Sequence, residues 1–417
     1  MLKTVKESVG SVWQLPARVL PVVRLLYLPA RALPAVRLFY LPVRIFLVAL
    51  LLQSLLIISS AAGTGNEQDS LFRIIFYNVE NLFDTANDPL RNDDDFTPDG
   101  ARRWTVFRLQ NKINNLYRAI VAAGDWHVPA IIGLCEVENR YVLEMLVNRT
   151  GLGRYRYGIV HRNSADRRGI DVAILYRPDR FELLAERFIP VSFPFDTVAT
   201  TRDIVYIKGV ASLSGPAASE ASAGSADTAG LAGYSGLAGL ADVAPADTLH
   251  LFANHWPSRW GGVAESSRYR NYAALVLRSL TDSIFSADPD ARIVIMGDFN
   301  DEPGDASLKN YLGAGFDYRE PEAGRLYNIS HENMRGQRSY KFRGEWFLFD
   351  QFIVSGALLG SAGGLRTSYG SVSVFAGEFL LVPDDTWFGY KPFRSYEGFR
   401  YTGGFSDHLP VVLDLFW

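Results

Sequence analysis

Two stretches of the chain, IVIMGDFND at residues 293–301 and GFSDHLPV at residues 404–411, decide how the rest of the sequence is interpreted. Each joins an apolar run, typical of a buried strand, to a compact group of Asp with Asn or His. Such a strand carries its polar residues to the rim of a sheet, where they could meet a metal ion and a phosphate group. The two stretches therefore predict metal-assisted attack of water on a phosphate ester.

Five more apolar runs carry a polar residue at or near one end. These residues are Asn78 and Glu80 in FYNVEN, Glu136 in IIGLCEVEN, Asp171 in IDVAILYR, His255 in LFANHW and Asp350 in FLFDQF. Any one of them alone would be interpreted as a cap or a loop residue, because polar side chains of this kind are common there. Seven such runs in one chain are better explained by a shared site.

The pattern after residue 70 predicts a layered α/β domain. Runs typical of strands recur at residues 71–81, 130–139, 155–162, 170–177, 203–213, 248–256, 292–300, 347–356 and 408–417. Helical patterns lie between some of them, at residues 106–123, 141–148 and 265–286. Strands with helices interspersed predict sheets that are covered by helices.

From Leu71 to Trp417 the chain resembles the endonuclease/exonuclease/phosphatase superfamily, which includes pancreatic deoxyribonuclease, apurinic endonucleases, neutral sphingomyelinases and inositol polyphosphate 5-phosphatases. The motifs Asn, Glu, His, GDFN, Asp and SDH follow one another in the family's order. The resemblance implies a four-layer α/β/β/α sandwich with two packed mixed β-sheets and a site between the sheet edges. The stretch NVENLFDT resembles an exported bacterial branch of the family.

The resemblance also implies roles for the acidic residues. Glu136 is the first-choice metal ligand. Asp407 adds a second contact or binds a second ion, and Glu80 acts near the ion through water. Mg²⁺ is a hard cation that prefers carboxylate oxygen and water, and the chain has no thiolate set for zinc, so we expect Mg²⁺ or Mn²⁺.

Other residues are assigned by the resemblance to the attack on phosphorus. Asp298 orients or deprotonates the attacking water, while Asn78 and Asn300 bind phosphate oxygens or hold Asp298. His408 needs a partner that fixes one ring nitrogen so that the other can act, and Asp350 is that partner.

His255 matches the family's second histidine, and we expect it to donate a proton to the leaving oxygen with Asp171 as its candidate partner. The alternative is that His255 only contacts the phosphate. Arg259 and Arg268 follow it in WPSRWGGVAESSRYR. Arginine forks suit phosphate oxygens, so both are candidates for substrate contacts. Exposed arginines without a specific role are the alternative.

Composition narrows the classes of function. The 417 residues are 48% hydrophobic and 21% charged, which is ordinary for a globular protein. The single cysteine, Cys135, excludes an intramolecular disulfide and a multi-cysteine zinc site. The chain has 42 basic and 45 acidic residues, and residues 1–50 contain seven of the basic and one of the acidic ones. Residues 51–417 therefore contain 35 basic and 44 acidic residues. This acidic part of the chain lacks the broad positive electrostatic field of a protein that binds DNA tightly.

The N-terminal segment is predicted to direct the protein out of the cytoplasm. Residues 1–44 are a basic extension in which LPARVLPVVRLLY is followed by LPARALPAVRLFY. Residues 45–63, IFLVALLLQSLLIISSAAG, are short for a spanning helix and suit the apolar core of a signal peptide. An uncleaved membrane anchor is the alternative. We therefore expect a periplasmic, membrane-anchored or secreted body.

Residues 71–417 are the expected catalytic domain, which a low-complexity insertion interrupts. Residues 211–246 are mostly Ala, Gly and Ser, and we expect a flexible connection without a function of its own. We expect the domain to be a monomer that binds a phosphate-ester substrate, with nucleic acid as the leading candidate.

Three functions remain open on the sequence alone. The first is an exported phosphodiesterase, in particular a nuclease. The second is a phosphatase or a sphingomyelinase-like phospholipase of the same superfamily. The third is a catalytically inactive binding module, and the intact set of acidic and histidine motifs argues against it.

Overall fold

The computed structural model describes residues 71–213, 246–317, 319–330, 337–360 and 363–417. They belong to one compact unit, Gln68–Trp417. The basic extension, the predicted signal segment and most of the predicted low-complexity insertion lie outside the described residues. Among the residues that are described, no helix has the length and apolarity needed to cross a membrane.

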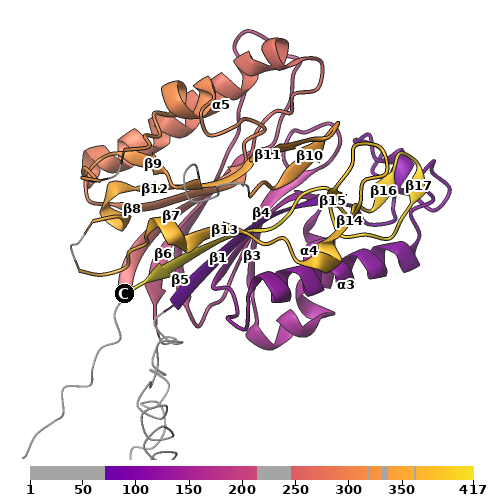
Figure 1. Cartoon of the computed structure of the whole chain (residues 1–417), viewed down its shortest axis with the longest axis horizontal. Coiled ribbons are helices and arrows are strands. Elements are labelled where there is room, and N and C mark those ends of the chain that lie inside the picture. The colour runs from indigo at the N-terminus through magenta and orange to yellow at the C-terminus, as the bar shows by residue number, and fades with distance from the viewer. Residues whose placement is uncertain (1–70, 214–245, 318, 331–336, 361–362) are drawn as a thin grey trace, which may run out of the picture. The chain divides into compact units, whose positions relative to one another are not determined.

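Two six-stranded mixed sheets pack face to face at the centre of this unit (Figure 1). The first sheet contains, in spatial order, β13 (Val372–Val374), β18 (Val411–Phe416), β1 (Leu71–Leu82), β2 (Ile131–Val137), β4 (Asp171–Tyr176) and β3 (Gly158–His161). The second contains β5 (Phe181–Ile189), β6 (Ile204–Ser212), β7 (Ala246–His255), β8 (Arg292–Asp298), β12 (Asp350–Ser355) and β9 (Leu326–Asn328).

Three two-stranded sheets and several short helices form the connections. The small sheets are β10 (Tyr340–Phe342) with β11 (Glu345–Phe347), β14 (Leu381–Pro383) with β15 (Tyr390–Pro392), and β16 (Tyr396–Glu397) with β17 (Arg400–Tyr401). The short helices are η1 (Asp94–Phe96), η2 (Gly151–Tyr155), η4 (Ser307–Leu312), η5 (Gly356–Leu358), η6 (Tyr369–Ser371) and η7 (Glu378–Leu380).

Helices cover the outer faces of both sheets. Helices α3 (Val106–Ala123) and α4 (Arg140–Asn148) pack on the first sheet, and α5 (Val263–Ala287) packs on the second (Figure 1). The side chain of Thr105 caps α3 by accepting a hydrogen bond from the backbone N–H of Arg108. The layers are therefore helix, sheet, sheet and helix, which confirms the predicted sandwich.

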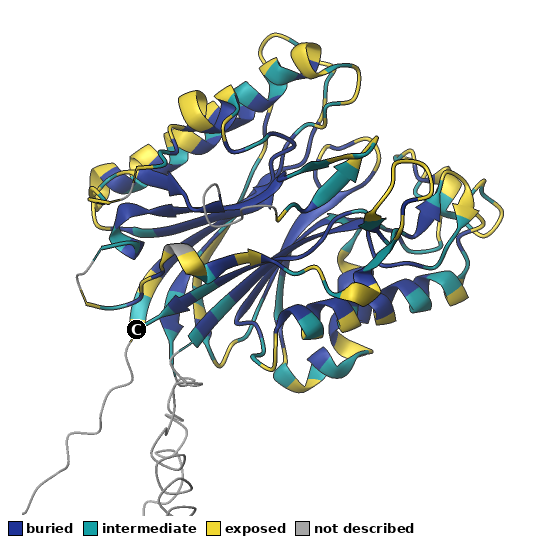
Figure 2. Cartoon of the chain, in the orientation of Figure 1, coloured by how far each residue is buried: buried dark blue, intermediate teal, exposed yellow. Residues whose placement is uncertain are grey.

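Alternation along the strands separates two apolar cores. In β8, Val294 and Met296 belong to the core between the sheets, whereas Ile293 and Ile295 pack toward α5. The sheets approach closely at Gly133, where an added Cβ would lie 2.8 Å from Sδ of Met296. Figure 2 shows the same division, with buried residues along the sheets and exposed ones on the outer sides of the helices.

The nine predicted strands and three predicted helices are all present, but the sequence did not predict β5, β9 and β13 of the large sheets or the strands of the small sheets. The longest of the missed strands is β5. Its sequence, FELLAERFI, is rich in good helix formers and lacks regular alternation. It is an edge strand whose conformation comes from pairing with β6.

The ends of the predicted low-complexity segment were placed wrongly. Ala211 and Ser212 belong to β6, and Ala246 begins β7. Ala211 is fully buried, and Ser212 is paired directly with Ala246. Small residues in this stretch concealed the end of one strand and the start of the next, because a buried alanine has the same composition signal as a linker alanine.

Candidate active site

Three predicted residues are neighbours at one edge of the second sheet. His255 ends β7, Asp298 ends β8 and Asp350 begins β12. The register pairs His255 with Asp298 across the parallel strands and Asp350 with Asp298 across the antiparallel strands. Residues paired in this way have adjacent backbones, so one edge gathers a histidine and two carboxylates.

Backbone irregularities shape the facing edge of the first sheet. The pairing of β1 with β2 shifts between Asn78 and Leu82, and the pairing of β2 with β4 shifts around Glu136. Glu80 and Glu136 have φ angles of 49° and 63°, which are uncommon for residues other than glycine. Bulges of this kind change the direction of a side chain. They explain how two glutamates leave the alternation of their strands.

Hydrogen bonds hold Asp298 between the two sheets. Nδ2 of Asn78 donates to Oδ2 of Asp298 at 3.0 Å, and the backbone N–H of Asn300 donates to Oδ1 at 3.0 Å. Oγ of Ser406 donates to the backbone carbonyl of Asn78 at 2.7 Å. The predicted role of Asn78 in holding Asp298 therefore agrees with the observed contacts.

The environment of Asp298 suits a general base. Its side chain is 2% exposed, and burial, supported by the nearby carboxylate of Asp350, raises the pKa of Asp298 to about 7. The charge of His408 and the hydrogen bonds from Asn78 and Asn300 act in the opposite direction. A base with a pKa near the working pH combines the correct protonation state with useful basicity.

Asp350 contacts His408, the residue that it was expected to orient. Oδ2 of Asp350 lies 2.7 Å from Nδ1 of His408, and Nε2 of His408 lies 3.8 Å from Oδ2 of Asp298. The ring stacks on Tyr340 with centroids 4.5 Å apart. Burial opposes the charged ring, but the two carboxylates outweigh it and raise the pKa of His408 to about 10. The two carboxylates therefore favour the protonated form of His408.

His255 reaches the site without its predicted partner. Its Nε2 lies 3.6 Å from Oδ2 of Asp298 and 3.9 Å from Oε1 of Glu136. Asp171 instead accepts a hydrogen bond from the backbone N–H of Ser164 and lies 3.4 Å from Nε2 of His161. The prediction that Asp171 orients His255 is wrong, because Asp171 begins β4 and faces the neighbouring strand β3.

The charge state of His255 favours contact with the phosphate over proton donation to the leaving oxygen. Burial and the nearby cations Arg202 and Arg168 lower the pKa of His255 well below its ordinary value. Its Nδ1 has no hydrogen-bond partner among the described residues. A neutral ring can donate a hydrogen bond to a phosphate oxygen, but it carries no extra proton for a leaving group.

An arginine that the sequence did not single out links the two other predicted metal ligands. Nε of Arg394 donates to Oε1 of Glu80 and Nη2 donates to Oδ2 of Asp407, each at 3.0 Å. The buried Lys112 lies behind them, with Nζ 3.9 Å from Oε2 of Glu80. Burial lowers the pKa of Lys112 to about 8, although the two carboxylates partly offset this. Neither cation belongs to a motif that the sequence could reveal.

Glu136 is the carboxylate that best fits a divalent cation. Its Oε2 accepts a hydrogen bond from the backbone N–H of Asn81, while Oε1 accepts none from the described residues. Its side chain is 15% exposed, and Nε2 of His255, whose pKa is lowered by burial, lies 3.9 Å from Oε1. A hard oxygen donor without a compensating cation suits Mg²⁺ or Mn²⁺.

A second group of possible metal ligands is better explained as catalytic. Atoms of Asp298, Asp350 and His408 lie within 4.8 Å of one another. Nδ1 of His408 is already hydrogen-bonded to Oδ2 of Asp350, so that pair of atoms is engaged within the protein. We therefore assign this group to proton transfer and hydrogen bonding.

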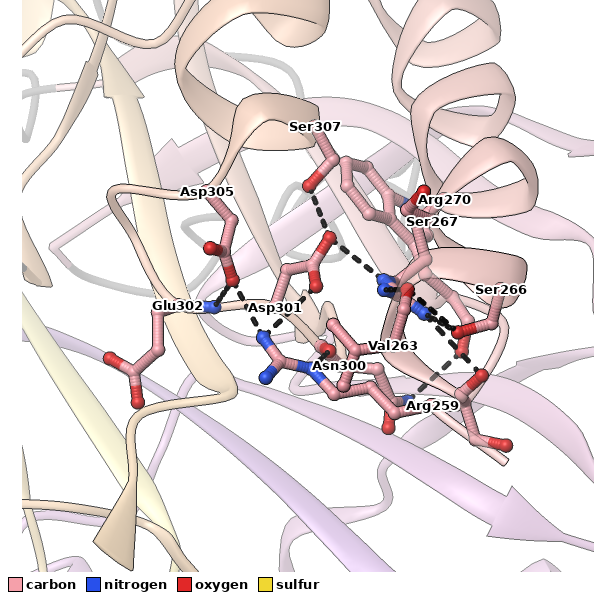
Figure 3. A network of polar contacts seen from close by, with 12 residues as sticks. Arg259, Val263, Ser266, Ser267, Arg270, Asn300, Asp301, Glu302, Asp305 and Ser307 are labelled. Carbon is pink, nitrogen blue, oxygen red and sulfur yellow. Dashed lines mark hydrogen bonds and ion pairs between the residues drawn. The ribbon is translucent and has the colours of Figure 1, made fainter. Parts of the chain in front are cut away.

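Arg259 supports the loop that follows β8 (Figure 3). Its Nε donates to the carbonyl of Asn300, and its Nη2 contacts Asp301 at 3.0 Å and Asp305 at 2.6 Å. The fully buried Arg270 lies 2.7 Å from the same Asp301. These donors are thus bound to protein acceptors, and the arginine that the sequence assigned to phosphate holds the GDFND loop in place.

The second predicted phosphate ligand, Arg268, makes its contacts elsewhere. Its Nη2 donates to the hydroxyl of Tyr269, and its guanidinium lies over the rings of Phe195 and Tyr269. Tyr269 in turn donates to Asp196. The contacts of Arg268 thus form a surface cluster on α5, and none of them involves the residues gathered around Asp298.

The fold and the site define a phosphoester hydrolase with an Asp–His pair and a facing glutamate. Residues 73–214 and 241–416 match the model of the Endonuclease/Exonuclease/phosphatase family. The chain belongs to this family, and the predicted superfamily is thereby confirmed. A search of curated proteins gave no match.

Several solved structures are similar to the chain, and each of three covers 83% of it. TDP2 of D. rerio, complexed with a single-strand DNA product, has 17% identity, 99% of its chain covered and a TM-score of 0.45. An endonuclease/exonuclease/phosphatase family protein of Bacteroides thetaiotaomicron has 16% identity, 97% of its chain covered and a TM-score of 0.44. A mannosyl-6-phosphatase of the same organism has 15% identity, 100% of its chain covered and a TM-score of 0.45.

Proposed function

We propose that this enzyme is a divalent-metal-dependent phosphodiesterase, in particular a nuclease, that acts outside the cytoplasm by attack of water on phosphorus. The single observation that carries the proposal is the bridge from Asn78 to Asp298, since it joins a buried base on one sheet to the facing glutamate edge of the other. A phosphate placed between these edges would contact both sides of the site.

Each residue of the proposed site then has a distinct role in the reaction. Asp298, with its raised pKa, takes a proton from the attacking water. The protonated His408, fixed by Asp350, stabilises the charge that develops on the phosphate oxygens and can release a proton to the leaving group. The neutral His255 and Asn300 donate hydrogen bonds to phosphate.

Glu136 would hold the metal ion. A Mg²⁺ or Mn²⁺ ion would supply positive charge to the phosphate oxygens as negative charge accumulates on them. The remaining negative charge near the site is already matched by Arg394 and Lys112.

Exposed aromatic side chains near His408 favour a nucleic-acid substrate over a small phosphate ester. Tyr340 of β10, which stacks on His408, is followed by the 52%-exposed Phe342, and β10 packs against β15. Before and within β15, Trp387, Phe388 and Tyr390 are all more than half exposed. Aromatic faces of this kind stack on unpaired bases, whereas the acidic body lacks the charge for tight duplex binding.

An activity panel tests the proposal. Purified 64–417 should hydrolyse single-stranded DNA or RNA in the presence of Mg²⁺ and lose this activity in EDTA, and added Mg²⁺ should restore it. Plasmid DNA, sphingomyelin and inositol phosphates serve as the alternative substrates. Full activity in metal-free buffer would exclude the proposed metal role, and exclusive hydrolysis of sphingomyelin or of phosphate monoesters would exclude a nuclease.

Export is part of the same proposal, and it is supported by the apolar run that follows Arg44 in the sequence. A reporter enzyme that is active only outside the cytoplasm, fused after Asp69, should be active. A fusion that remains inactive, cytosolic and uncleaved would contradict export. A reporter fused after Arg44, before the apolar run, provides the matched control and should stay inactive.

A further inference from the structure

Two of the three carboxylates that the sequence assigned to metal binding are already neutralised by the protein. The guanidinium of Arg394 lies between Glu80 and Asp407 and donates to both at 3.0 Å. The backbone N–H of Ser395 donates to the other oxygen of Glu80 at 2.7 Å. Both oxygens of Glu80 therefore already accept hydrogen bonds from protein donors, and the side chain is only 5% exposed.

The charges in this subsite balance without a metal ion. Glu80 and Asp407 contribute two negative charges, and Arg394 and Lys112 contribute two positive charges. Nζ of Lys112 is fixed by Oγ of Ser395 at 2.6 Å, and its side chain is only 1% exposed. A divalent cation placed between these carboxylates would have to displace the arginine, and it would be repelled by the buried lysine.

Glu136 presents the opposite situation. Among the described residues no Lys or Arg lies within 4.0 Å of it, and one of its oxygens accepts no hydrogen bond. It is the acidic group of the site that lacks a compensating charge. A cation that binds there gains the attraction of a partly exposed carboxylate without displacing a protein donor.

We propose that Arg394 takes the place of a second metal ion, so that the enzyme holds a single divalent cation on Glu136. This inference rests on the proposed metal-dependent hydrolysis. The side chain of Arg394 is 39% exposed, and its Nη1 has no acceptor among the described residues. That group can donate to a phosphate oxygen, which gives the substrate a fixed positive charge where a second cation would otherwise lie.

The number of bound Mn²⁺ ions, counted by electron paramagnetic resonance on the full chain in detergent, tests the proposal independently of turnover. The wild type should bind one ion. Arg394→Met removes the charge while keeping most of the side-chain volume, and it should bind two, because Glu80 and Asp407 lose their bridge. Arg268→Met, which removes an exposed arginine outside the site, is the matched control and should bind one.

Glu136→Gln locates the single ion and should bind none. Retention of the ion in this variant would place it on other side chains than Glu136 and overturn the proposal. Two ions in the active wild type would also overturn it, while the proposed hydrolysis would stand. A wild type that binds no Mn²⁺ and hydrolyses nothing would reject both. Circular dichroism checks that each variant is folded. If Arg394→Met fails to fold, the number of Mn²⁺ ions bound by the wild type still tests whether the enzyme holds a single cation.

Discussion

Nδ2 of Asn78 lies 3.0 Å from Oδ2 of Asp298, although the two residues are separated by 220 positions and belong to different sheets. The contact joins β1 of the first sheet to β8 of the second at the edge where His255 and Asp350 also lie. A buried carboxylate needs hydrogen-bond donors, and the amide supplies one without adding charge. The relative position of the two sheets is thereby coupled to the position of Asp298, the proposed base.

The titration of Asp298 and His408 should shape the pH dependence of turnover. Asp298 must lose its proton to act, so kcat/KM should rise as the pH increases toward about 7 and then level. The midpoint of this acidic limb should lie at about pH 7 or below, because a nearby divalent cation lowers the pKa of a carboxyl group. His408 acts while protonated, so the rate should decline again as the pH approaches about 10.

A kcat/KM profile at saturating Mg²⁺ measures both limbs. Asp298→Asn should remove most activity and abolish the acidic limb in whatever activity remains. A wild-type rate that does not change between acidic and neutral pH, with the chemical step rate-limiting, would contradict the assignment of Asp298 as the base.

Substitution of His408 should lower turnover while the fold persists. General acid–base groups contribute about 10²–10⁴-fold, so His408→Ala should reduce kcat by roughly that factor. Asp350→Asn should have a smaller effect in the same direction, since it loosens the 2.7 Å contact that orients the ring but keeps the ring itself.

His127→Ala provides the matched control, because this histidine lies before β2, at the opposite end from Glu136. Its turnover should equal that of the wild type. If His408→Ala retained full turnover on the best substrate, with unchanged circular dichroism, the SDH motif would have to be explained as a structural strand end.

Removal of the buried Arg270 should destabilise the second sheet and its catalytic loop. Its guanidinium is 2.7 Å from Asp301, and the two side chains are 1% and 6% exposed. Removing one partner leaves a buried charge without compensation, which typically costs about 3–5 kcal/mol of unfolding free energy. Urea denaturation of Arg270→Met measures this loss.

Arg140→Met is the control for that measurement. Arg140 pairs with Glu144 at 3.0 Å, but about half of each side chain is exposed. Exposed pairs contribute about 0–1 kcal/mol, so this substitution should change the free energy of unfolding little. Equal losses for the two variants would refute a structural role for the buried pair.

The segment between β6 and β7 should be replaceable by a tight turn. Ser212 is paired with Ala246, so Asn-Gly in place of residues 213–245 would form a two-residue hairpin between paired residues. Closing a shorter loop costs less entropy, so the free energy of unfolding should not fall, and turnover should be unchanged. A large loss of turnover would reveal a function for the segment.

A deletion that also removes Ala211, Ser212 and Ala246 tests the strand boundaries. Ala211 is fully buried and pairs with Asp247 in β7 and Phe181 in β5. This longer deletion should lower the midpoint of urea denaturation below that of the hairpin variant. Equal midpoints would mean that these residues add nothing to the sheet.

The sequence by itself determined the layered α/β class and the motifs of the site, because strand alternation and residue type are local properties. It placed Asp298, Asn300 and His408 at the ends of buried runs, and it matched Asp350 to His408 through the family's order of motifs. It could not predict β5, whose helix-forming residues become a strand only by pairing with β6.

Only the tertiary structure decided which charges meet. Arg394 lies 314 residues from Glu80 in sequence, and no local pattern distinguishes it from other loop arginines. The same holds for Asp171, whose motif suggested His255 but whose position beside β3 gives it His161. Electrostatic partners depend on distances between strands of different sheets, and those distances exist only once the two sheets have packed.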